Sequence, residues 1–124
     1  MSKKILAIDD DPDILDAIKF TLEGEGYEVT VSEKGEYAGN LQDKNGGIPD
    51  LIILDVLLSG KDGRTICKNL KSKDDTKHIP IIMISAHPDA EKSSIEVGAD
   101  DFLAKPFDVS VLLERVEKLT KNRN

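Results

Sequence analysis

Short, uninterrupted apolar runs constrain this sequence more than any other feature. Three of them occupy residues 5–8 (ILAI), 51–54 (LIIL) and 81–84 (IIMI). A strand that is covered on both faces needs such a run, whereas a strand with one wet face alternates apolar and polar residues. The runs therefore predict the central strands of a parallel sheet that has helices on both faces.

Two further segments complete the predicted sheet. Residues 27–31 alternate apolar and polar side chains, which is typical of an edge strand, and residues 102–104 form a short last strand. Helical spacing fills the intervals, over residues 14–22, 35–45 (weakly), 64–73, 90–97 and 108–121. The alternation predicts an α/β fold with a doubly wound, flavodoxin-like, five-stranded parallel sheet, strand order 2-1-3-4-5, and five helices on both faces.

The length and charge of the chain limit its organisation and its partners. Its 124 residues predict one domain over residues 1–124, without an output domain. The net charge of −7 argues against binding nucleic acid or an anionic membrane surface. The chain lacks a signal-peptide pattern and any apolar stretch near the ~18 residues that cross a bilayer, so we expect a cytoplasmic location. The single cysteine, Cys67, is expected to be a buried apolar side chain.

Polar residues follow the predicted strands at their carboxyl ends. They are Asp9 and Asp10 after the first strand, Asp55 after the third, Ser85 after the fourth and Lys105 after the fifth. Ligands of open α/β sheets bind outside the carboxyl ends of the strands, where the winding reverses. The predicted topology therefore gathers carboxylates, a hydroxyl and an ammonium group in one crevice.

The acidic run at residues 9–11 divides into two functions. Asp11 precedes Pro12, which is favoured at the first turn of a helix, so Asp11 is predicted to cap that helix. Asp9 and Asp10 have no such local role, and they would repel Asp55 across the crevice. A divalent cation would remove this repulsion, and carboxylate, carbonyl and water oxygens suit Mg²⁺ or Mn²⁺.

A cation beside a carboxylate, a hydroxyl and a lysine indicates phosphoryl transfer, where positioning and electrostatics do most of the work. A carboxylate can itself be the nucleophile and form an acyl phosphate. Asp55 is the best candidate, because it lies at the centre of the sheet. The loop that follows it contains Gly60 and Gly63, so a phosphodonor could approach.

Four motifs in this order resemble the receiver domain of two-component response regulators, and in particular a single-domain, chemotaxis-regulator-like receiver. They are ILAIDDDPDIL, PDLIILDVLLSGKDG, IPIIMISA and GADDFLAKPF, and the match covers the whole chain. The resemblance implies that Asp55 takes a phosphoryl group from a histidine kinase or a histidine phosphotransfer protein. It implies that Asp9, Asp10 and Asp55 hold Mg²⁺ together with the backbone carbonyl of Leu57, Asp10 being a more direct ligand than Asp9.

The resemblance also assigns the switch. It implies that Ser85 and Lys105 contact the phosphoryl group, that the Lys105–Pro106 bond is cis, and that Phe102 is an aromatic residue whose rotation couples to Ser85. The surface formed by the fourth helix, fifth strand and fifth helix would then change its affinity for a downstream protein effector. Such a protein is not an enzyme beyond its own phosphorylation and slow dephosphorylation, and it acts as a monomer or a phosphorylation-dependent dimer.

Two positions depart from the family pattern, and a third lies close to the predicted site. Ser59 replaces the usual proline, which predicts altered loop dynamics rather than lost phosphorylation. Phe102 lacks the hydroxyl of the tyrosine that many relatives carry, which favours a buried rotamer. His87 either tunes the access of water to the acyl phosphate or is an ordinary exposed loop residue.

Several other charged residues have no predicted site role. We expect Asp100 and Asp101 to be solvated or to form turns, and the charges of the last helix, including Arg115, to form a solvated face.

Two other functions compete with the switch. Asp9-x-Asp11 resembles the nucleophile and acid/base pair of haloacid-dehalogenase-type phosphatases. Against that reading, Pro12 makes Asp11 a helix cap, the chain is short for that family, and Asp55 would have no role. The second alternative is a receiver-like module that binds partners without being phosphorylated, although the complete set of polar site residues argues against it.

Overall fold

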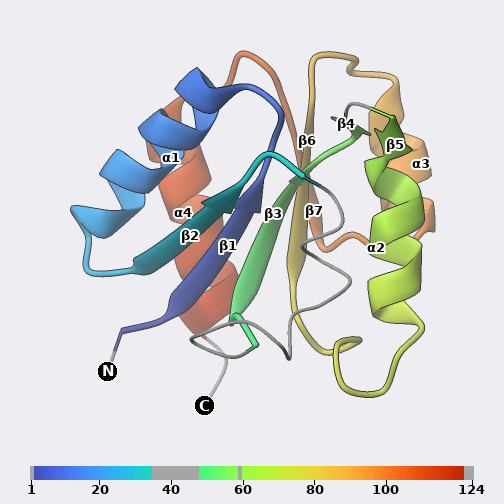
Figure 1. The fold of residues 1–124 in the computed structure, drawn as a ribbon, viewed down its shortest axis with the longest axis horizontal. Coiled ribbons are helices and arrows are strands. Elements are labelled where there is room, and N and C mark those ends of the chain that lie inside the picture. Colours follow the sequence, from blue (N-terminus) through green and yellow to red (C-terminus); the bar gives the residue numbers. More distant parts are fainter. Residues whose placement is uncertain (1, 35–47, 59, 122–124) are drawn as a thin grey trace.

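A five-stranded parallel sheet forms the centre of the computed structural model, which describes residues 2–34, 48–58 and 60–121. Its strands are β1 (Lys4–Ile8), β2 (Glu28–Ser32), β3 (Leu51–Asp55), β6 (Ile81–Ser85) and β7 (Asp101–Ala104). The strands lie in the order β2-β1-β3-β6-β7 (Figure 1). Since β6 and β7 are the fourth and fifth strands of this sheet, the predicted order 2-1-3-4-5 is confirmed.

Four helices within the described residues cover the two faces of the sheet. They are α1 (Pro12–Glu23), α2 (Gly63–Lys71), α3 (Ala90–Glu96) and α4 (Val109–Lys121). Helices α1 and α4 cover one face, while α2 and α3 cover the other (Figure 1). We predicted five helices, and the one expected at residues 35–45 lies outside the described residues. The fourth and fifth predicted helices correspond to α3 and α4.

The all-apolar strands have a direct structural explanation. Successive side chains of β1 point to opposite faces, so Leu6 and Ile8 pack with α2 and α3 whereas Ile5 and Ala7 pack with α1 and α4. These four side chains are at most 2% exposed.

Cys67 belongs to the core under α2, as predicted, and burial raises the pKa of its thiol to about 11.

The edge strand and the loop after β3 complete the framework. On β2, Val29 is buried between the exposed Glu28 and Thr30, as the alternating pattern predicted. The chain after β3 forms a small antiparallel hairpin from β4 (Leu57–Leu58) and β5 (Lys61–Asp62). Sequence reasoning missed this hairpin, because two-residue strands carry no periodic signal. Ser59, the departure from the family pattern, lies outside the described residues.

No helix within the described residues combines the length and the apolar composition that crossing a bilayer requires.

Replacing the cap of α1 should weaken the fold. The carboxylate of Asp11 accepts a hydrogen bond of 2.9 Å from the N–H of Asp13, and Pro12 occupies the first helical position, as predicted. We expect Asp11→Ala to reduce the free energy of unfolding by about 1 kcal/mol, measured by urea denaturation. Asp11→Asn should retain most of the stability, because asparagine caps equally well; an equal loss in both variants would contradict this role.

Candidate functional site

The register of the sheet brings the predicted site residues together at one edge. Strands β1 and β3 are aligned so that Asp9, which follows β1, lies beside Asp55, the last residue of β3. Strand β7 is paired with β6 up to Ser85, so Lys105 follows β7 at the same edge. Parallel pairing therefore places residues from four parts of the sequence at one crevice.

Three carboxylates converge in this crevice. One oxygen each from Asp9, Asp10 and Asp55 lies within 4.8 Å of the others. Asp9 and Asp55 are buried, at 0% and 4% exposure, while Asp10 is exposed. Carboxylate oxygens at this spacing, with one side open to water, match the hard donor set that Mg²⁺ and Mn²⁺ prefer.

Asp9 is the fully buried carboxylate of the cluster. Its Oδ1 accepts a hydrogen bond of 2.9 Å from the N–H of Asp11. Its Oδ2 lies 2.9 Å from the ammonium nitrogen of Lys105, and this ion pair compensates its charge. One lysine faces both Asp9 and Asp55, so the two buried carboxylates share a single compensating charge. A cation bound between the carboxylates would add to this compensation.

Asp55 carries the most perturbed carboxyl group of the crevice. Burial raises its pKa from 3.8 to about 6, and the neighbouring charge of Asp9 adds to the increase. The charge of Lys105 and the N–H of Leu57, 3.4 Å from Oδ1 of Asp55, act in the opposite direction. A cation beside this carboxyl group would favour its ionised, nucleophilic form.

Lys105 connects the two buried carboxylates. Its ammonium nitrogen lies 2.9 Å from Oδ2 of Asp9 and 3.4 Å from Oδ2 of Asp55. Burial lowers the pKa of Lys105, but the two carboxylates outweigh that effect and the pKa is raised. Lys105 is therefore a permanent positive charge in the crevice. The bond between Lys105 and Pro106 is cis, as the resemblance implied.

Ser85 and Phe102, the two residues predicted to form the switch, are both buried. Ser85 is buried at the end of β6, and its hydroxyl accepts a hydrogen bond of 3.0 Å from the N–H of His87. Phe102 is 7% exposed on β7 and packs in the core under α2 and α3, as predicted for a buried rotamer. His87 is exposed at the rim of the crevice.

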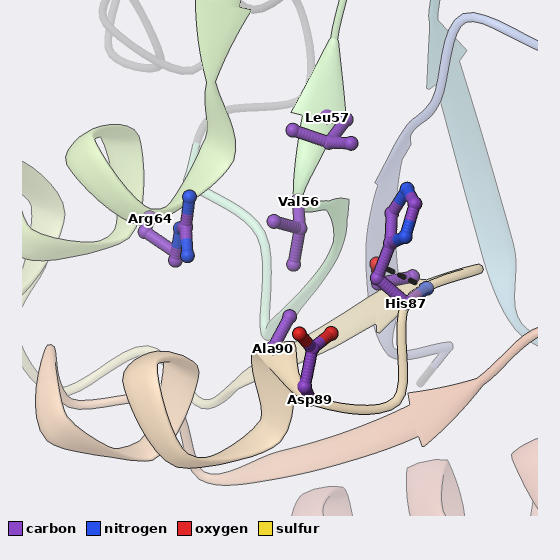
Figure 2. Close-up of a pocket in the computed structure, with 7 residues that line it drawn as sticks. Val56, Leu57, Arg64, His87, Asp89 and Ala90 are labelled. Atoms are coloured by element: carbon purple, nitrogen blue, oxygen red, sulfur yellow. Dashed lines mark hydrogen bonds between the residues drawn. The ribbon is translucent and has the colours of Figure 1, made fainter.

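A cavity of about 230 Å³ adjoins the crevice on the side of α3 (Figure 2). Residues from the ends of β3 and β6, the start of α2 and the start of α3 surround it. They are Val56, Leu57, Arg64, Ser85, His87, Asp89 and Ala90. The imidazole of His87 and the carboxylate of Asp89 stand on one side of this space and Arg64 on the other.

Two acidic residues that we predicted to be solvated or to form turns also make specific contacts. Oδ2 of Asp100, which is exposed at a bend, accepts hydrogen bonds of 2.8 Å from the N–H of Ile81 and from the ammonium group of Lys71. Both carboxylate oxygens of Asp101 lie 2.8 Å from Nη1 of Arg115 on α4. These contacts fix the start of β7, and the prediction missed them because their partners are 14 to 29 residues away in sequence.

Comparison with known proteins identifies the family. The chain matches the response regulator receiver domain over residues 5–117. It belongs to this family. As a receiver domain it is part of two-component signalling, where such domains interact with histidine kinases and downstream effectors and bind Mg²⁺ through acidic residues. Receiver domains are not enzymes in the usual sense.

Individual relatives agree with this assignment. The chain is 37% identical to the response regulator PleD of Caulobacter vibrioides, over 98% of this chain and 27% of PleD. It is 40% identical to the DNA-binding regulator RpaA of a Synechocystis strain, over 95% of this chain and 49% of RpaA. The receiver domain of a histidine kinase from Syntrophus aciditrophicus superimposes with a TM-score of 0.87 at 34% identity, covering 99% of this chain and 95% of that one. The chain thus spans at most about half of these two curated relatives.

The family assignment and the geometry together disfavour the phosphatase alternative. An acid/base residue needs a free carboxyl group, but the side chain of Asp11 caps α1 through its bond to Asp13. In addition, Asp55 has a role in a receiver domain that it would lack in the phosphatase.

Neutralising Asp55 should stabilise the metal-free fold. Because its folded pKa of about 6 exceeds 3.8, ionised Asp55 destabilises the protein above pH 6, and this cost disappears below pH 4. We expect Asp55→Asn in EDTA to raise the free energy of unfolding by roughly 1–3 kcal/mol at pH 7.5. Urea denaturation from pH 7.5 to 4 should show the gain shrinking; a gain independent of pH would contradict the electrostatic cause.

Gly63 should tolerate no side chain. A Cβ atom at this position would overlap the backbone carbonyl of Asp55. The Gly63 N–H also donates a 2.6 Å hydrogen bond to the carbonyl of Val56, which holds the two segments close together. We expect Gly63→Ala to displace the segment after β3 and to cost about 1–3 kcal/mol in unfolding free energy. Gly60→Ala should be a contrasting control: no atom lies near its Cβ position, and only its positive φ angle opposes the change.

Proposed function

We propose that Asp55 is the phosphoacceptor of this receiver domain and takes its phosphoryl group from a phosphohistidine in a Mg²⁺-dependent step. The donor would be a histidine kinase or a histidine phosphotransfer protein. The observation that most supports the proposal is the convergence of Asp9, Asp10 and Asp55 around one point, next to the ammonium group of Lys105.

The side chains of the crevice suit an in-line phosphoryl transfer. A carboxylate oxygen of Asp55 attacks the phosphorus atom, and the phosphorus–nitrogen bond of the donor breaks. Its electron pair returns to the imidazole nitrogen, so the products are an acyl phosphate and an unphosphorylated histidine. Lys105, already 3.4 Å from Oδ2 of Asp55, offsets the negative charge of the transferred group.

The acidic residues of the crevice would hold the metal ion. Asp9, Asp10 and Asp55 provide carboxylate oxygens, and the backbone carbonyl of Leu57 would complete the protein ligands, with Asp10 as a direct ligand. Mg²⁺, or Mn²⁺ in its place, would supply positive charge beside the phosphoryl oxygens. The three carboxylate oxygens, which lie within 4.8 Å of one another, support this assignment.

The phosphoryl group would then act through Ser85. Its added charge of about −1.5 to −2 attracts hydrogen-bond donors, so the hydroxyl of Ser85 turns toward it and leaves the N–H of His87. Phe102 would adjust in the space that Ser85 vacates. The output surface, which we define as α3, β7 and α4, would change its affinity for a downstream protein effector.

The same proposal sets the scope of the activity. Residues 1–124 would act as one receiver unit in the cytoplasm, through protein–protein contacts rather than by binding nucleic acid or a membrane. The unit would be a monomer or a phosphorylation-dependent dimer. Its chemistry would be limited to its own phosphorylation and a slow dephosphorylation.

Acetyl phosphate labelling tests the proposal. The protein is incubated with acetyl phosphate and Mg²⁺. Mass spectrometry of the digested protein then locates the added phosphoryl group. We expect label on Asp55 that is absent in Asp55→Asn, while Asp11→Asn, which keeps the helix cap, should be labelled normally. Omitting Mg²⁺ should abolish most of the labelling.

The other results of this experiment identify the competing functions. Label on Asp9, with turnover of a phosphomonoester, would indicate the phosphatase. No label from acetyl phosphate or from a panel of histidine kinases would indicate a receiver-like module that binds partners without being phosphorylated.

A further inference from the structure

The side chain of Arg64 links the segment after Asp55 to helix α3. Its Nε and Nη2 donate hydrogen bonds of 2.9 and 2.7 Å to the carboxylate of Asp62. Its Nη1 donates a third, of 3.0 Å, to the hydroxyl of Ser93 on α3. The guanidinium group is planar, so the two bonds to Asp62 also fix the direction of the bond to Ser93.

One end of this link is held rigidly against the phosphoacceptor strand. Asp62 caps α2 by accepting a 2.9 Å hydrogen bond from the N–H of Arg64. The preceding Gly63 packs against the backbone of Asp55 and donates to the carbonyl of Val56. The backbone of Arg64 is therefore fixed relative to the site.

The other end of the link is on a weakly anchored helix. Helix α3 has seven residues, and its first turn lacks a side-chain cap, since Asp89 makes no capping bond. Its buried residues are Ala90 and Ser94, which offer little apolar surface. The hydroxyl of Ser94 is buried without a hydrogen-bond partner among the described residues, which weakens the packing further. Helix α3 is thus weakly anchored, and the bond from Arg64 to Ser93 is one of the contacts that hold it.

Helix α3 is also connected to the crevice through the chain that precedes it. His87 lies two residues after Ser85, and its N–H donates a hydrogen bond of 3.0 Å to the Ser85 hydroxyl. Helix α3 begins three residues after His87, at Ala90. The cavity of about 230 Å³ lies between this segment and Arg64, so it provides room for the start of α3 to move (Figure 2). When Ser85 turns toward a phosphoryl group, His87 loses its acceptor and this segment is released.

We propose that Arg64 is a positioning residue that holds α3 in its unphosphorylated place through Ser93, and that this hydrogen bond is lost when Asp55 is phosphorylated. The inference rests on the proposed function. Arg64 is not a binding site for the phosphoryl group itself, because its charge is already paired with Asp62.

A contact that exists in only one of two states shifts the equilibrium between them. Removing the Arg64–Ser93 bond would destabilise the unphosphorylated state alone, so ligands of the phosphorylated state should bind more tightly. A merely structural contact would be lost equally from both states, and its removal would leave such affinities unchanged. The affinity for a phosphoryl analogue therefore distinguishes the two roles.

Ser93→Ala is the central variant, and beryllofluoride with Mg²⁺ is the probe, since it mimics a phosphoryl group on a carboxylate. We expect Ser93→Ala to bind beryllofluoride with an apparent affinity about fivefold higher than that of the wild type. The affinity is measured by titration monitored through amide NMR signals. Hydrogen exchange of the α3 amides should accelerate about fivefold in the unliganded variant. With beryllofluoride bound, the variant and the wild type should exchange at the same rate.

Three matched variants make the result specific. Ser93→Thr keeps the hydroxyl and should bind with wild-type affinity. Arg64→Leu should raise the affinity like Ser93→Ala, although Ser93→Ala also removes a 3.1 Å bond from the hydroxyl to the Ala90 carbonyl and Arg64→Leu also removes the ion pair with Asp62. The effect of the double variant should fall short of the sum of the two single effects, because the Arg64–Ser93 bond is removed only once. Ser94→Ala, on the same helix, removes a hydroxyl that makes no hydrogen bond to any described residue, and it should not accelerate exchange.

The results that would overturn the inference differ from those that would overturn the proposed function. Labelling of Asp55 by acetyl phosphate is measured in every variant. If Asp55 is labelled but Ser93→Ala binds beryllofluoride like the wild type, or the effects of Ser93→Ala and Arg64→Leu simply add, Arg64 is not the positioning residue. A wild-type protein that takes no label on Asp55 would overturn both proposals.

Discussion

The mutual repulsion of Asp9 and Asp55 is the interaction on which this site depends. Two buried carboxylates side by side oppose folding, and the pKa of Asp55 rises to about 6 as a result of its burial and of the Asp9 charge. Lys105 offsets part of this repulsion through its contacts with both side chains. In the proposed function, the remaining imbalance would make a cation favourable there, and then a phosphoryl group beside the cation and Lys105.

The fold around the site holds these repelling charges together. The apolar strands are buried on both faces and keep the carboxyl ends in register, so the carboxylates cannot move apart. Gly63 carries the chain back past Asp55 at a separation that leaves no room for a side chain. Helix α3 contrasts with this rigidity, because it has few buried residues and no side-chain cap. A rigid site beside a weakly held helix suits a protein in which a charge change in one place alters contacts elsewhere.

Much of the fold could be predicted because local patterns reflect burial directly. Runs such as residues 51–54 indicated central strands, and Pro12 indicated where α1 begins. The hairpin of β4 and β5 escaped prediction, since two residues per strand leave no period to detect. The contacts of Asp100 and Asp101 escaped it as well, because an ion pair depends on a partner far away in the chain.

The sequence by itself determined the α/β class and the identity of the polar residues at the strand ends, because hydrophobic periodicity is a local property. The predicted strand order was consistent with the edge pattern of β2, but strand pairing joins distant segments, so the tertiary structure established it. The tertiary structure alone decided how these residues meet. It buried Asp9 while leaving Asp10 exposed, placed Lys105 between two carboxylates, and directed Arg64 to Ser93 on α3. Distances and desolvation arise only when distant segments pack together, so no reading of the acidic run at residues 9–11 could have supplied them.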